Sequence, residues 1–65
     1  MSPLLTRRET DVLQLIAAGL TDRQIAATLS VSRKTASNHV SSILHKIGVA
    51  TRASAASYAV RAGLA

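Results

Sequence analysis

The sequence of 65 residues contains no cysteine, one proline, three acidic residues and a single aromatic residue, Tyr58. Without cysteine the chain can form no disulfide and offers no thiolate to a metal ion. No apolar run approaches the roughly 18 residues needed to span a membrane, and the first residues lack a signal-peptide pattern. We therefore expect a cytoplasmic protein without a membrane segment, whose core is built from aliphatic side chains.

Acidic residues are too few and too clustered for catalysis. All three lie before residue 23, so there is no carboxylate pair for acid–base chemistry, and no glycine-rich phosphate loop is present. His39 and His45 would lie about 120° apart on a helix, without a nearby carboxylate to complete a metal shell. Glu9 has two structural roles open to it, capping a helix at Thr6 or pairing with a cation such as Arg52. We predict no enzyme, no catalytic residue, no cofactor, no metal and no small-molecule ligand.

Positive charge is distributed unevenly along the chain. The net charge of +5 is made up of −1 over residues 1–22 and +6 over residues 23–65, which contain no acidic residue. Such an excess indicates an acidic partner, and nucleic acid is the first candidate. The alternative is an ordinary solubilising surface, and the location of the cations must decide between the two.

Capping residues mark the helix boundaries. Thr6 with Glu9, and Thr21 with Gln24, have the spacing of a capping box, in which two side chains satisfy free backbone amides at a helix start. Two later segments begin with a similar hydroxyl residue, and glycine follows three of the segments. Together with apolar residues at helical spacing, this predicts an all-α fold. We expect a compact four-helix bundle that forms a single domain over residues 1–65, with helices at about 7–18, 22–29, 33–47 and 52–62.

The second and third predicted helices form a helix-turn-helix. They are joined by about three residues, and the third helix is the longer and more basic of the pair. At 100° per residue, Ala36, Val40 and Ile43 share a stripe that faces the core, while the opposite face carries small polar side chains. Asparagine can pair with adenine, serine with any base edge and lysine with guanine. The predicted base-reading residues are therefore Lys34, Ser37, Asn38 and Ser41.

Hydroxyl groups, cations and helix N-termini can hold phosphates without reading the base sequence. The residues that we assign to phosphate binding are Thr21, Arg23, Ser32, Arg33, Thr35, His39 and Lys46. Because Tyr58 is the only aromatic residue, stacking on unpaired bases is disfavoured, and duplex DNA is favoured over single strands. Two alternatives stay open: a protein-interaction module whose basic face docks on an acidic partner such as RNA polymerase, and RNA binding.

The sequence also resembles a known family. The segments LTRRE at 5–9, AGLT at 18–21, QIA at 24–26, NHV at 38–40 and KIGV at 46–49 are similar to those of LuxR-type helix-turn-helix domains. The similarity covers nearly the whole chain. It implies a four-helix bacterial DNA-binding domain, usually C-terminal in response regulators, quorum-sensing receptors or large ATPase regulators. It also implies a homodimer on paired half-sites, with the third helix in the major groove.

The same resemblance implies roles for individual residues. It matches base-reading positions to Ser37, Asn38 and Ser41 and phosphate contacts to Thr35, His39 and Lys46, and it implies a dimer contact on the fourth helix through Ser54, Tyr58, Arg61 and Ala62. Where the family often has Thr-Val-Lys or Thr-Val-Glu, this chain has Thr-Ala-Ser at 35–37. The weight of base recognition therefore moves to Asn38. The segment is either the effector domain of a longer regulator or a stand-alone regulator.

Overall fold

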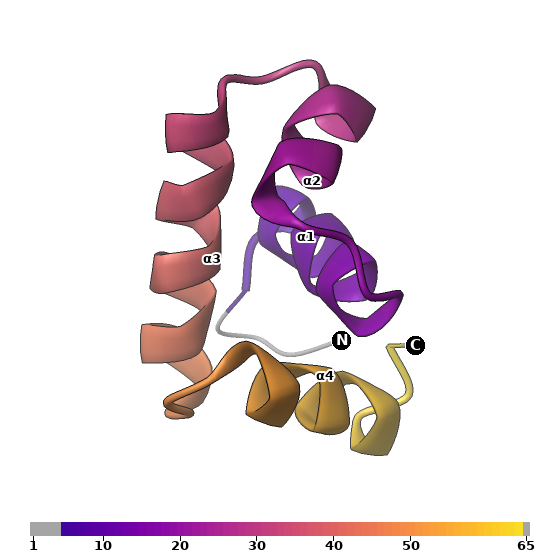
Figure 1. The fold of residues 1–65 in the computed structure, drawn as a ribbon. Coiled ribbons are helices and arrows are strands. Elements are labelled where there is room, and N and C mark those ends of the chain that lie inside the picture. The colour runs from indigo at the N-terminus through magenta and orange to yellow at the C-terminus, as the bar shows by residue number, and fades with distance from the viewer. Residues whose placement is uncertain (1–4, 65) are drawn as a thin grey trace.

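A computed structural model describes residues 5–64 of the chain, and this part contains four α-helices (Figure 1). They are α1 (Arg7–Ala17), α2 (Asp22–Leu29), α3 (Arg33–Ile47) and α4 (Arg52–Arg61). The expected all-helical, four-helix fold is confirmed, whereas residues 1–4 and 65 of the predicted domain lie outside the described residues. The ranges expected for α1 and α4 are each one residue too long, because Ala18 and Ala62 cap the helices at their C-terminal ends. None of the helices in residues 5–64 is long and apolar enough to cross a membrane.

Each helix begins with a hydroxyl cap. The Thr6 hydroxyl accepts a hydrogen bond from the Glu9 amide at 3.1 Å, and the Glu9 carboxylate accepts one from the Thr6 amide at 2.9 Å. The start of α2 has the same reciprocal pair of bonds. Ser32 and Thr51 each accept a bond from the amide three residues ahead at 3.0 Å. These bonds satisfy amides that have no partner inside the helix, and they confirm the caps predicted from the sequence.

The core lies where α1, α3 and α4 meet, with α2 packed on α3. The largest side chains without solvent exposure come from the first three helices; they are Val12, Leu13, Ile25 and Ile43. The fourth helix contributes two fully buried alanines, Ala55 and Ala59. Small side chains allow α4 to approach α1 closely. In contrast, the Cα atoms of α2 and α4 nowhere come within 8 Å of each other. These two helices are therefore joined mainly through α1 and α3.

The turn between α2 and α3 contains a serine in a glycine conformation. Ser30 has φ 57° and ψ 43°, which makes it the only non-glycine residue with positive φ in residues 5–64. The amide of Val31 donates to the Ala26 carbonyl at 3.0 Å, and the amide of Ser30 donates to the Ala27 carbonyl at 3.4 Å. This is a Schellman motif, and α1 and α3 end in the same motif with glycine at the equivalent position. A side chain at this position therefore adds strain.

Replacing Ser30 by glycine is expected to raise the free energy of unfolding by about 0.5 kcal/mol, because relief of the left-handed strain exceeds the added freedom of the unfolded chain. Urea unfolding followed by circular dichroism measures the change. The matched control is Ser57→Gly, which places the same substitution inside α4 at an exposed position and should lower stability by about 0.5–1 kcal/mol. A loss of stability in both variants would contradict the prediction.

Candidate nucleic-acid interface

The helices α2 and α3 and the three-residue turn at 30–32 have the organisation of a helix-turn-helix (Figure 1). The inner face of α3 is held by the core, since Ala36, Val40 and Ile43 are all buried. The two apolar residues that follow, Leu44 and Ile47, are half-buried and pack against the same cluster. The apolar stripe predicted for this helix is therefore confirmed, and the opposite face of α3 is left to solvent.

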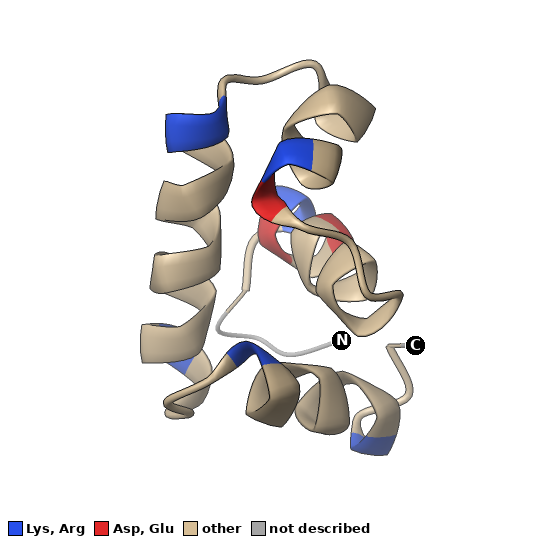
Figure 2. Cartoon of the chain, viewed as in Figure 1, with Lys and Arg blue, Asp and Glu red and all other residues tan. Residues whose placement is uncertain are grey.

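The exposed face of α3 is polar but almost without charge. The four residues assigned to base reading are all exposed and lie on one face of α3, at positions i, i+3, i+4 and i+7; they are Lys34, Ser37, Asn38 and Ser41. Residues 35–45 contain no Asp, Glu, Lys or Arg, so charge in α3 is confined to its two ends (Figure 2). In residues 5–64 none of the four side chains makes a hydrogen bond to another residue. Their donors and acceptors are therefore available to a ligand.

The residues assigned to phosphate binding differ in whether their side chains already form hydrogen bonds within the protein. Arg23 on α2 and Arg33 on α3 are exposed cations. The hydroxyls of Thr21 and Ser32 already serve as helix caps, and Ser32 also donates to the Thr35 hydroxyl at 2.9 Å. These residues stand at the N-terminal ends of α2 and α3, where the helix dipole favours an anion. His39, which lies further along α3, is half-buried.

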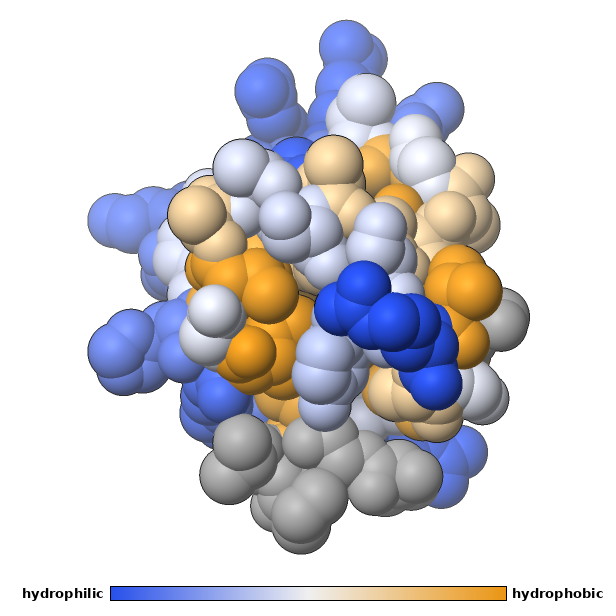
Figure 3. All heavy atoms as spheres, turned by 90° about the horizontal axis from the view of Figure 1, so that it is seen from below, coloured by the Kyte–Doolittle hydropathy of each residue, from blue (hydrophilic) through white to orange (hydrophobic). Residues whose placement is uncertain are grey.

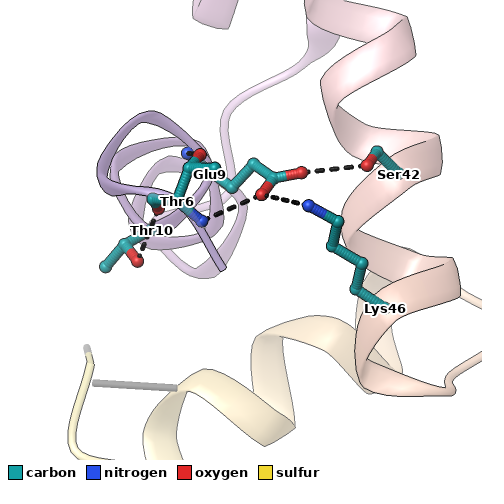
Figure 4. Close-up of polar contacts among 5 residues, drawn as sticks. All are labelled: Thr6, Glu9, Thr10, Ser42 and Lys46. Carbon is teal, nitrogen blue, oxygen red and sulfur yellow. Dashed lines mark hydrogen bonds and ion pairs between the residues drawn. The ribbon is translucent and has the colours of Figure 1, made fainter. Parts of the chain in front are cut away.

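A buried carboxylate links α1 to α3 (Figure 4). Glu9 accepts a hydrogen bond from the Lys46 ammonium at 2.8 Å and one from the Thr6 amide at 2.9 Å, both at Oε1. Its other oxygen, Oε2, accepts from the Ser42 hydroxyl at 2.9 Å. Ser42 and Lys46 are four residues apart and so lie one turn from each other on α3. One carboxylate therefore holds two successive turns of α3 against the start of α1.

The electrostatics of Glu9 follow from these partners. The Lys46 ammonium, then the Thr6 amide and more weakly the Ser42 hydroxyl, lower the pKa of Glu9 from 4.5 to about 2, although burial acts in the opposite direction. Glu9 fills both of the roles considered for it, as a cap and as an ion-pair partner. The predicted ion pair between Glu9 and Arg52 was wrong, because Glu9 pairs with Lys46. Ser42 was missed, although its position on the same side of α3 as Lys46 was a usable signal.

Arg52 instead pairs with the start of α2. Its guanidinium donates from Nη1 to the Asp22 carboxylate at 2.5 Å and from Nη2 to the Leu20 carbonyl at 2.6 Å. Both partners lie at the junction of α1 and α2. The sequence offered several acids and cations of suitable charge, and only the packing of the helices shows which of them meet.

The outer face of α4 is exposed and partly apolar. Figure 3, which views the molecule from below, shows hydrophobic and hydrophilic areas side by side on the face where α4 lies. Of the residues assigned to a dimer contact, Tyr58 is half-buried against the core and the other three are exposed, namely Ser54, Arg61 and Ala62. Val60, which was not singled out from the sequence, is 64% exposed. It lines a shallow depression with Ala56, Ser57 and Arg61, and a second depression along α4 is lined by Val49, Ala53, Ser54, Ser57 and Arg61.

Comparison with known proteins adds an independent line of evidence. Residues 3–59 match the family described as bacterial regulatory proteins, luxR family. The chain is 52% identical over 60 residues to the uncharacterized transcriptional regulatory protein YhcZ of Bacillus subtilis, covering 92% of this chain and 28% of that protein. It is 41% identical over 61 residues to the spore germination protein GerE of the same organism, covering 94% of this chain and 82% of GerE.

The solved structure of the transcription factor GerE superimposes on this fold with a TM-score of 0.83 at 35% identity, covering 97% of this chain and 94% of that one. Other relatives are much longer: the chain spans only 25% of the transcriptional regulatory protein DegU of Brevibacillus brevis, to which it is 45% identical over 60 residues. The family match covers most of the chain, and the fold agrees with it. The chain therefore belongs to the luxR family of bacterial regulatory proteins, and it is a DNA-binding transcription-regulator domain of a non-enzymatic family.

Proposed function

We propose that this chain binds double-stranded DNA sequence-specifically as the effector domain of a bacterial transcription regulator, with α3 in the major groove. The observation that carries the proposal is the exposed row of hydrogen-bonding side chains on α3, which have no partner within residues 5–64. The major groove of B-DNA is wide enough to admit an α-helix. The small side chains in the middle of α3 allow its backbone to approach the base edges closely.

The base contacts follow from the chemistry of each side chain. Asn38 lies in the middle of the row and can pair bidentately with an adenine, and Lys34 at the start of α3 can donate to a guanine. Ser37 and Ser41 lie on either side of Asn38 along the helix, and their hydroxyls can donate or accept. Asn38 therefore carries the largest share of base discrimination.

The phosphate contacts set the register of α3 in the groove. The Thr21 hydroxyl and the exposed cation Arg23 lie at the start of α2, and Ser32, the exposed cation Arg33 and Thr35 lie at the start of α3. We assign phosphate contacts to these residues and to His39. Lys46, whose side chain is 36% exposed, keeps two N–H donors beyond the one bound to Glu9, and these serve the same purpose at the other end of α3. Contacts of this kind position the protein without reading the sequence.

The functional unit of the proposal is a homodimer in the bacterial cytoplasm. Its support is α4, where Val60, Ser54, Arg61 and Ala62 are exposed and Tyr58 is half-buried. Two copies paired through α4 would present two α3 helices to paired half-sites, as twofold symmetric regulators do. RNA polymerase is a further partner of such a regulator. The relatives that are much longer than this chain support its assignment as one domain of a larger protein.

The salt dependence of binding to a random duplex tests the proposal. Each phosphate neutralised by a cation contributes about −0.9 to the slope of log affinity against log salt. With phosphate contacts from Arg23, Arg33 and Lys46, a slope of about −3 per bound protomer is expected. Absence of binding at low salt would favour the alternative of a protein-interaction module that docks on an acidic partner. Preference for single-stranded RNA would overturn the assignment to duplex DNA.

Selection of bound sites from a random duplex pool tests the symmetry of the complex. Enrichment of an inverted repeat is expected, because two copies related by a twofold axis read the same sequence on opposite strands. Enrichment of one unrepeated half-site would contradict the dimer and leave DNA binding by α3 intact. The selected duplex also supplies the cognate probe for measurements on variants.

Replacing Asn38 by alanine is expected to weaken binding to the selected duplex by about 1–3 kcal/mol, while binding to random duplex changes little. The variant loses the bidentate contact to a base and no phosphate contact. Fluorescence anisotropy titrations with both duplexes measure the two affinities. Because the side chain of Asn38 is exposed, circular dichroism should show an unchanged fold.

Arg33→Ala is the matched control for Asn38→Ala, since both residues are exposed on α3. Loss of a phosphate contact should weaken binding to the selected and the random duplex alike and reduce the salt slope by about 1. Equal losses on the two duplexes for Asn38→Ala would exclude it as a base-reading residue.

A further inference from the structure

We infer that Arg52 is a positioning residue that fixes α4 relative to the helix-turn-helix and thereby sets the separation of half-sites that a dimer prefers. The inference rests on the proposed function and extends it to a residue outside the DNA-contacting face. It starts from the position of Arg52 as the first residue of α4, the helix that carries the proposed dimer contact.

One guanidinium joins the start of α4 to the junction of α1 and α2, some 30 residues earlier in the sequence. Nη1 of Arg52 donates to the carboxylate of Asp22, the first residue of α2, and Nη2 donates to the carbonyl of Leu20 in the turn before it. Both bonds have the charged guanidinium as donor, and charge-assisted hydrogen bonds are stronger than those between neutral groups. The planar fork of arginine makes both bonds directional, so that they define an orientation as well as a separation.

Apart from the bond of Arg52 to Asp22, α2 and α4 are not in direct contact in residues 5–64. Their Cα atoms nowhere lie within 8 Å of each other, and in residues 5–64 no other side-chain hydrogen bond or ion pair connects the two helices. The fully buried side chains of α4 are two alanines, Ala55 and Ala59, and Tyr58 is half-buried against the core. The packing of α4 therefore rests mainly on small side chains, and the directional bonds at Arg52 add a constraint on its orientation relative to α2.

The orientation of α4 matters for a dimer on DNA. When two copies pair through α4, the distance and angle between their α3 helices depend on how each α4 is set against its own helix-turn-helix. Half-sites on one face of the duplex are separated by about one helical turn, and each base-pair step changes both the separation and the rotation of the second half-site. A loosened α4 would tolerate several spacings and bind the best one less well.

The spacing preference of the dimer tests this role. The probes are the duplex selected by the unmodified chain, variants of it with one to five base pairs inserted or removed between half-sites, and a duplex with one half-site. Fluorescence anisotropy gives the affinity of the 65-residue chain for each probe at two salt concentrations. The variants are Arg52→Met, Arg52→Lys and the control Arg8→Met, which removes the same charge from an exposed position on α1.

Arg52→Met should reduce the ratio of affinities between the best and the worst spacing by about tenfold, the effect of losing charge-assisted hydrogen bonds of this kind. Its affinity for one half-site and its salt slope should stay within about twofold of the unmodified chain, because the guanidinium bonds to Asp22 and not to phosphate. Arg52→Lys keeps the charge and one of the two bonds. Its ratio of affinities between the best and the worst spacing should therefore lie between that of Arg52→Met and that of the unmodified chain. Arg8→Met should keep the full spacing preference.

Several results would overturn the inference. One is an unchanged spacing profile in a folded Arg52→Met or Arg52→Lys. Another is a parallel loss on the single half-site with a shallower salt slope, which would make Arg52 a phosphate ligand. Absence of any spacing preference in the unmodified chain would remove the inference while leaving DNA binding intact. Absence of duplex binding by the unmodified chain would instead overturn the proposed function. If Arg52→Met does not fold, Arg52→Lys decides the question.

Discussion

Replacing Glu9 by glutamine is expected to lower the free energy of unfolding at neutral pH by about 2 kcal/mol and to remove most of the acid sensitivity of the domain. The buried carboxylate accepts hydrogen bonds from Lys46, Thr6 and Ser42, and these hold its pKa in the folded chain at about 2 against an ordinary value of 4.5. Because Lys46 is more than one-third exposed, solvent screens the pair and reduces its contribution below the full value that the shift implies.

The pH range of this effect follows from the sign of the shift. A carboxylate whose pKa is lower in the folded state stabilises the fold above its unfolded pKa and loses that contribution as the pH falls through its folded pKa. The difference in stability between the unmodified chain and Glu9→Gln should therefore be constant above about pH 5 and nearly vanish at about pH 2. Urea unfolding at several pH values, followed by circular dichroism, measures it.

Asp11→Asn is the control for Glu9→Gln, because it removes another carboxylate from the same helix. The pair of Asp11 with Arg7 spans 3.9 Å, and its two side chains are 43% and 88% exposed. A pair of this kind contributes less than about 0.5 kcal/mol. The same acid dependence in Glu9→Gln and in the unmodified chain would show that Glu9 is not the group that responds to pH.

Replacing Ile43 by alanine is expected to cost about 3 kcal/mol of stability, a large share of the roughly 3–10 kcal/mol available to a domain of this length. Ile43 has no solvent exposure and fills the core between α3 and its neighbours. Its truncation leaves a cavity and removes the largest of the buried side chains that hold α3 against the core. The midpoint of urea unfolding should fall with an unchanged slope, and affinity for the selected duplex should fall with the folded fraction.

Val60→Ala is the comparison for Ile43→Ala, since it also truncates a β-branched aliphatic side chain. Val60 is 64% exposed, so the substitution should change the stability by less than about 0.5 kcal/mol. In the proposed dimer it should instead weaken self-association, which sedimentation measures. A small effect of Ile43→Ala on unfolding would show that α3 is held mainly by polar contacts such as those of Glu9.

Much of the fold could be predicted because the signals for helix ends are local. A threonine hydroxyl reaches an amide three residues away, so the boxes that begin at Thr6 and Thr21 are visible in the sequence and present in the structure. Glycine marks the left-handed ends of α1 and α3 in the same way. The exception is Ser30, where the turn imposes a left-handed conformation on a residue that does not favour it. The turn that brings α3 against α2 requires this conformation, and that packing is not visible in the sequence.

The exposed face of α3 was also predictable, because helical periodicity assigns each residue to a side. The buried stripe of Ala36, Val40 and Ile43 agrees with the pattern, and this leaves Asn38 and its neighbours exposed. Long-range ion pairs were not predictable. Glu9 could have met any of several cations, and the choice of Lys46 depends on the side of α3 that faces α1.

The sequence by itself therefore determined the four helices, their caps, and the core stripe and polar row of α3, since these depend on contacts between residues close in the chain. The tertiary structure decided which charges meet. It placed Lys46 on Glu9 and Arg52 on Asp22, and it left Val60 outside the core. These outcomes depend on how whole helices pack against one another. The absence of cysteine and the scarcity of acid excluded other kinds of site, whereas the three carboxylates that remain, at positions 9, 11 and 22, all form ion pairs with cations of the chain.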